Sequence, residues 1–185
     1  MRRIYAASLI LIAIVASARA DGVKVNRPAP VVQHKTFDRK NPPKDMPPLE
    51  GEEAAVTKSI FGIESEFSIL VEPAEKRGAK TINKVKIAGV NATLSLKITV
   101  WVPEDAAKVI VEHEEGHRQI SEYFYKDAEK VARSIAGEYV GQTYSVEGED
   151  IEAASKKALD KVLTEMSQKY MGQTQVISGH SMLIS

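Results

Sequence analysis

Apolar and polar residues alternate strictly along residues 93–102, which is the clearest pattern in the chain. A period of two is typical of a strand that buries one face. Residues 63–71 and 82–88 alternate in the same way, and Pro73 is expected to end the first of these strands. Because residues 89–91 (Gly-Val-Asn) can turn the chain, 82–88 and 93–102 are expected to form an antiparallel hairpin. The expected buried face of its second strand carries Leu94, Leu96, Ile98, Val100 and Val102.

The spacing of the apolar residues changes to steps of three and four after Pro103. This spacing predicts a long helix over about residues 104–136, and Gly137 is expected to end it. His113 and His117 fill the one gap in the apolar series. The helix is therefore expected to carry both histidines on the stripe that faces the core.

A second amphipathic pattern predicts a helix over about residues 150–171. The remainder of the chain is expected to be a loop, and it contains His180. Together these elements predict an α+β fold, in which a small antiparallel sheet packs on the first long helix and a second helix follows at the C-terminal end.

Six of the eight prolines lie between Pro28 and Pro48. Since proline removes backbone donors and this stretch has no periodicity, residues 21–53 are expected to form a flexible tether. His34 lies within it and is expected to be solvated rather than a ligand. The folded domain is expected to span residues 54–185.

The first twenty residues have the composition of a secretory signal peptide. Two arginines precede an apolar run over residues 6–18, and Ala18-Arg19-Ala20 offers a small-x-small cleavage site. The alternative is an uncleaved anchor, but the run is shorter than the roughly 20 residues needed to span a bilayer. The protein is therefore expected to be exported, to the periplasm or beyond the cell.

Charge and cysteine content limit the partners. Removal of residues 1–20 takes away three arginines and no acids, which leaves 22 basic against 25 acidic residues and a net charge of −3. This balance gives no support to nucleic-acid binding, and no stable membrane span is expected after cleavage. Because the chain has no cysteine, a metal site would have to use His, Asp or Glu.

The sequence His113-Glu114-Glu115-Gly116-His117 lies in the first predicted helix. Residues four apart on a helix lie about 40° apart around its axis, so the two imidazoles can bind one ion. In H-E-x-x-H zinc hydrolases the histidines are ligands and the glutamate is the general base that activates water. A catalytic zinc site usually has a third protein ligand, and the residues leave His180 and Glu138 as equal alternatives.

The stretch from Trp101 to Ala132 resembles a bacterial family of uncharacterised domains predicted to be secreted zinc-dependent proteases of the zincin type. Members tend to combine a Trp-x-Pro strand end, a His-Glu-x-Gly-His helix and a C-terminal Tyr-Asp…Thr-x-His-Gly segment. In that last segment this chain has Met171 in place of the aspartate, and Gly179 precedes the histidine. The positions that carry the resemblance are Trp101, Pro103, His113, Glu114, Gly116, His117, Ile120, Ser121, Glu122, Tyr170, Thr174 and His180.

The resemblance implies a zincin-like fold and favours His180 as the third zinc ligand. The predicted function is an exported zinc-dependent hydrolase, and more specifically a peptidase that acts on a peptide or protein. Glu114 is expected to act as general base and Tyr170 to donate a hydrogen bond to the developing oxyanion. An extended substrate is expected to pair with the sheet along residues 94–102. The alternative is a non-catalytic exported binding or assembly module that retains a structural zinc site.

Overall fold

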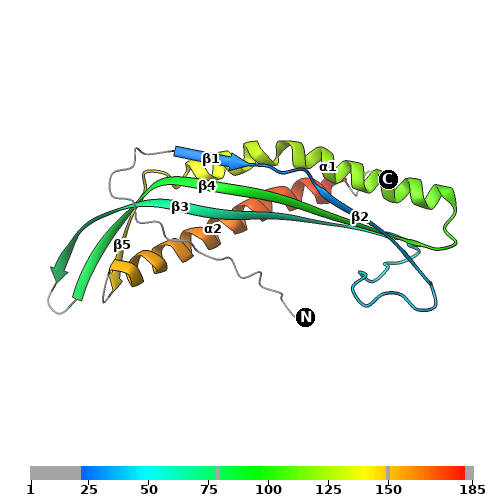
Figure 1. Cartoon of the computed structure of the whole chain (residues 1–185), viewed down its shortest axis with the longest axis horizontal. Coiled ribbons are helices and arrows are strands. Elements are labelled where there is room, and N and C mark those ends of the chain that lie inside the picture. Colours follow the sequence, from blue (N-terminus) through cyan, green and yellow to red (C-terminus); the bar gives the residue numbers. More distant parts are fainter. Residues whose placement is uncertain (1–21, 78–79, 149–150, 182–185) are drawn as a thin grey trace. The chain divides into compact units, whose positions relative to one another are not determined.

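The structure, a computed structural model, describes residues 22–77, 80–148 and 151–181 (Figure 1). The predicted signal peptide over 1–20 lies outside these residues. Among those described, neither helix is long and apolar enough to cross a membrane. The elements in chain order are β1 (Gly22–Asn26), β2 (Val31–Phe37), β3 (Val56–Arg77), β4 (Lys80–Pro103), α1 (Lys108–Gly137), β5 (Thr143–Gly148) and α2 (Ile151–Ser181).

Five strands form a mixed sheet in which every other strand pairs with β4. β1 and β2 run parallel to β4, whereas β5 runs antiparallel to it. The expectation of a small antiparallel sheet on the long helix is therefore wrong. The strand edge over residues 94–102 that was expected to receive a substrate is already paired along most of its length, because β2 pairs with Lys97–Pro103, and β3 pairs with β4 as well.

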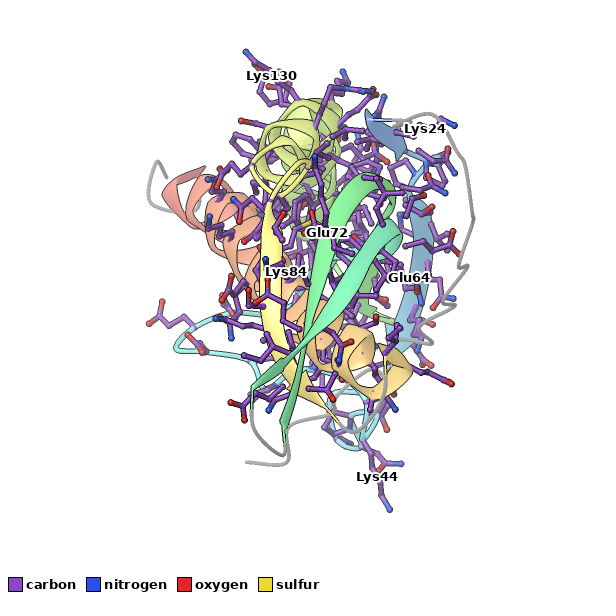
Figure 2. The ribbon with its side chains drawn as sticks, turned by 90° about the vertical axis from the view of Figure 1, so that its left-hand side faces the viewer. Lys24, Lys44, Glu64, Glu72, Lys84 and Lys130 are labelled. Carbon is purple, nitrogen blue, oxygen red and sulfur yellow. The ribbon has the colours of Figure 1, made fainter. Side chains whose placement is uncertain are left out.

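The parallel strands β1 and β2 lie in the segment that was expected to be a tether. The prolines do not prevent this pairing, since Pro28 and Pro30 lie between the two strands and the other four follow β2. Val31 pairs with Lys97, and Figure 1 shows β2 running alongside the last part of β4. The loop after β2 carries the remaining prolines, and Lys44 points outward from it (Figure 2).

β4 continues through residues 89–91, where a turn was expected. Gly89 pairs with Gly22 and Val90 with Val23, so this stretch forms a ladder with β1. The alternation of buried and exposed residues changes phase at this point, because the neighbouring residues Ile87 and Ala88 are both buried. On the N-terminal side β4 pairs with β5, and on the C-terminal side with β1. β3 likewise extends past Pro73 to Arg77.

The helices differ from expectation at their ends. β4 extends to Pro103, and α1 begins at Lys108 after a short turn in which the Ala106 amide donates to the Pro103 carbonyl. The predicted stop at Gly137 is confirmed. α2 continues to Ser181, through the segment that was expected to be a loop.

The chain groups into two compact units, each assembled from separate segments. Among the described residues, those within 22–26, 63–93 and 130–170 are here called the first unit, and those within 27–62, 94–129 and 171–181 are called the second unit. The second unit contains the whole H-E-x-x-H sequence, together with β2 and the beginning of β3. The candidate site is therefore built within one unit.

Candidate metal centre

The buried side of α1 passes through Glu114 rather than through the histidines. Glu114 is 5% exposed and begins a line of buried residues that continues with Ser121, Tyr125 and Ala128. His113 is exposed and His117 is half-buried. The expectation that both histidines lie on the core-facing stripe is therefore wrong. The reason is the helical phase, since successive residues point about 100° apart and the contact line is displaced by one residue.

The two imidazole rings nevertheless lie against one another, in an edge-to-face arrangement. The Nε2 atoms of His113 and His117 lie 3.1 Å apart, and their ring planes are inclined by 86°. In a tetrahedral zinc site with Zn–N bonds of about 2.0–2.1 Å, two ligand nitrogens lie about 3.3–3.4 Å apart. The pair thus fits the edge of such a site within about 0.3 Å. Without metal, one Nε2–H can donate a hydrogen bond to the other nitrogen at this distance.

Thr57, in β3, holds the carboxylate of Glu114. Its hydroxyl donates a hydrogen bond of 2.7 Å to Oε2 of Glu114, and it also lies 3.2 Å from the backbone carbonyl oxygen of the same residue. A hydroxyl carries one proton, so it can donate a full hydrogen bond to only one of these two oxygens. The shorter contact, to the carboxylate, is the stronger hydrogen bond. Glu114 is consequently fixed against the sheet at the level of the histidine pair.

Alternate residues of β3 continue this contact along α1. Ser59 and Ser121 are joined through their hydroxyls at 2.7 Å, and the ring of Phe61 packs on that of Tyr125 with centroids 6.2 Å apart. Strand residues two apart point to the same face, and helix residues three or four apart do likewise. This matching of periods explains why the start of β3 follows the buried line of α1.

A cavity of about 580 Å³ lies beside the histidines. Glu114 and both histidines contribute to its wall, and much of the rest is apolar. Such a concave site, with a few convergent polar groups, has the size of a ligand pocket. The other lining residues are Glu52, Glu53, Ala54, Ala55, Val56, Thr57, Val109 and Ile110.

Charged residues on the next face of α1 form a separate network. Glu115 pairs with Arg118, which also pairs with Glu122. His34, which was expected to be solvated in a tether, lies in β2 with its Nε2 3.4 Å from Oε2 of Glu115. The Arg118 guanidinium, and to a lesser extent His34, hold the pKa of Glu115 below its usual value. This network connects α1 to β2. It does not include either histidine of the adjacent pair.

The remaining predicted site residues have different surroundings. Tyr170 belongs to the first unit, and its side chain is completely buried there. Glu138 also belongs to the first unit, and its Oε2 lies 2.6 Å from Nζ of Lys169. The side chain of His180 lies outside what the structure describes. The backbone of α2 from Met171 onward belongs to the second unit, as the histidine pair does.

Among the described residues, no group of three His, Asp or Glu side chains is arranged to hold a metal ion. The described part of the site is thus two imidazoles and a neighbouring carboxylate. Sequence reasoning missed Thr57 and the residues just before it, because residues 52–57 carry no periodic pattern. The signal that the sequence did offer was Thr57 itself. Its hydroxyl side chain lies at the start of a strand, just before the alternating segment.

Comparison of the chain with family models, with curated proteins and with solved structures finds no match. The resemblance to secreted zinc-dependent proteases therefore stays a prediction that rests on the residues quoted for it.

Proposed function

We propose that this protein is an exported zinc-dependent hydrolase and that its substrate is a peptide or protein. The observation that carries the proposal is the 3.1 Å separation of the His113 and His117 Nε2 atoms beside the cavity. At this distance the rings can share one Nε2–H hydrogen bond, and the same convergence of two nitrogens beside an open cavity also fits a shared divalent cation.

The residues of the chain divide the chemistry between them. His113 and His117 hold the zinc, with His180 as the third ligand that the resemblance favours. Zinc at such a site supplies a nucleophilic water at neutral pH. Glu114 would accept the proton from a water at that site, and its carboxylate is held in one orientation by Thr57.

The walls of the cavity suggest the kind of substrate. Ala54, Ala55, Val56 and Val109 provide an apolar surface next to the histidines. An apolar side chain of a peptide gains roughly 1.5–3 kcal/mol by leaving water in such a pocket. The cavity is therefore proposed to select peptides with an apolar residue next to the cleaved bond.

The test compares two neighbouring carboxylates on α1. Glu114→Gln keeps an acceptor for Thr57 but cannot take a proton, so it should retain zinc and lose cleavage of an unstructured protein such as casein. Glu115→Gln is the matched control, because Glu115 binds Arg118 on another face, and it should retain cleavage. Zinc retention with no cleavage by the wild type, on casein and on a broad peptide library, would favour the non-catalytic zinc module.

A further inference from the structure

A carboxylate next to two histidine ligands has two possible roles. In some zinc enzymes a glutamate completes the ligand set with two histidines, and in H-E-x-x-H sites the intervening glutamate is the base. Sequence position alone does not force Glu114 into the second role, because its side chain is flexible. Something in the fold has to keep the carboxylate off the metal.

Thr57 is in the position to do this. Its hydroxyl donates to Oε2 of Glu114 at 2.7 Å, and this bond joins the first residues of β3 to the second turn of α1. The bond is part-buried and Glu114 itself is only 5% exposed, and a hydrogen bond to a carboxylate is stronger than one between two neutral groups. Among the described residues the Glu114 carboxylate forms no three-member ligand group with the two histidines, although it adjoins His113 in sequence.

We propose that Thr57 is a positioning residue that holds the Glu114 carboxylate out of the zinc coordination sphere, so that Glu114 serves as base and not as ligand. This inference rests on the proposed zinc site. It goes further by assigning to a strand residue the choice between two chemical roles for the same carboxylate.

A neighbouring contact provides an internal comparison. Ser59 lies two residues further along β3 and makes a 2.7 Å hydroxyl contact with Ser121 of α1. Both contacts join β3 to α1, but Ser59 touches no side chain of the proposed site, and its partner Ser121 reaches only the backbone carbonyl of His117. A purely structural role for Thr57 predicts that Thr57→Val and Ser59→Ala behave alike.

The experiment uses the mature protein loaded with Co²⁺, whose visible absorption reports the number and geometry of ligands. Thr57→Val should change the Co²⁺ spectrum and tighten metal binding, because the released Glu114 carboxylate adds a ligand; the expected gain is roughly tenfold, the order of magnitude by which outer-shell residues change metal affinity. The added Glu114→Gln substitution should reverse both changes. In the zinc-loaded protein Thr57→Val should lower kcat roughly 100-fold, the usual scale of a general base, and leave KM little changed.

Thr57→Ser should restore the wild-type spectrum and kcat, and Ser59→Ala should change neither. The proposal is overturned if Thr57→Val leaves the spectrum, the affinity and kcat at wild-type values while Co²⁺ binds. It is also overturned if Thr57→Val and Ser59→Ala lower kcat equally. If the wild type binds neither Co²⁺ nor zinc, the proposed function fails first and this inference with it.

Discussion

His113 and His117 direct their Nε2 atoms toward each other across one turn of α1, at a separation of 3.1 Å. Neither ring lies on the buried stripe of the helix, and His113 is exposed. Core packing therefore does not impose this arrangement. A metal ligand pair at the wall of a cavity needs this combination of access and convergence.

The first prediction concerns metal content. His113→Ala and His117→Ala should each reduce bound zinc from about one equivalent to less than about 0.1, because each removes one of the three proposed protein ligands and two remaining imidazoles make a weak site. Zinc can be measured by elemental analysis of the purified mature protein. His34→Ala is the matched control, since that imidazole contacts Glu115 from β2, and it should retain the metal. Equal zinc in all three variants would contradict the site.

The second prediction separates Glu138 from the metal. Glu138→Gln should leave zinc content unchanged and slightly lower the melting temperature at neutral pH. The hydrogen bond that the Lys169 ammonium donates to Glu138, as the largest cause, raises the pKa of Lys169 above its usual 10.5. Because the pKa of Lys169 is raised in the folded state, its pairing with Glu138 contributes its full stability below about pH 10.5. That contribution is lost as the pH rises through the folded-state pKa. The difference between wild type and variant should accordingly shrink above that pH.

Salt provides the control for that pair. Both side chains are about half exposed, so the effect of Glu138→Gln on the melting temperature should fall as ionic strength increases. A loss of zinc from Glu138→Gln would instead return Glu138 to the ligand set.

Local patterns in the sequence located the elements better than their partners. The alternation along residues 93–102 correctly marked a strand, and Leu94, Leu96 and Ile98 are at most 1% exposed. The pairing of β2 with β4 joins residues 66 positions apart, such as Val31 and Lys97. The local alternation of apolar and polar residues carries no information about such a distant pairing. The prolines around β2 favoured the prediction of a tether instead.

The site was predictable as a set of residues but not as an orientation. The five-residue motif identified His113, Glu114 and His117, and the structure brings these together at one cavity. The motif did not show that Glu114, and not the histidines, faces the sheet. Polar residues along the contact line, among them Glu114 and Ser121, made the buried stripe look like a solvated face. Their partners, Thr57 and Ser59, come from a strand more than fifty residues earlier.

The third prediction concerns the aromatic end of the contact between β3 and α1. Tyr125 is completely buried, and its hydroxyl has no hydrogen-bond partner among the described residues. A buried unsatisfied polar group costs about 1–3 kcal/mol, so Tyr125→Phe should raise the free energy of unfolding by about 1 kcal/mol. Tyr123→Phe is the matched control, because that side chain is exposed, and it should change stability by less than about 0.5 kcal/mol. Urea unfolding measures both; a loss of stability in Tyr125→Phe would mean that the hydroxyl is satisfied.

The fourth prediction concerns the third ligand. The backbone of α2 from Met171 onward belongs to the same unit as His113 and His117, whereas Glu138 belongs to the other. If His180 completes the site, His180→Ala should weaken zinc binding by at least roughly 100-fold, because it removes one of three protein ligands. Competition with a chromogenic chelator measures the affinity, and His180→Cys should recover part of it by offering a thiolate ligand. Unchanged affinity in His180→Ala, together with metal loss in His113→Ala, would require a third ligand from elsewhere in the chain.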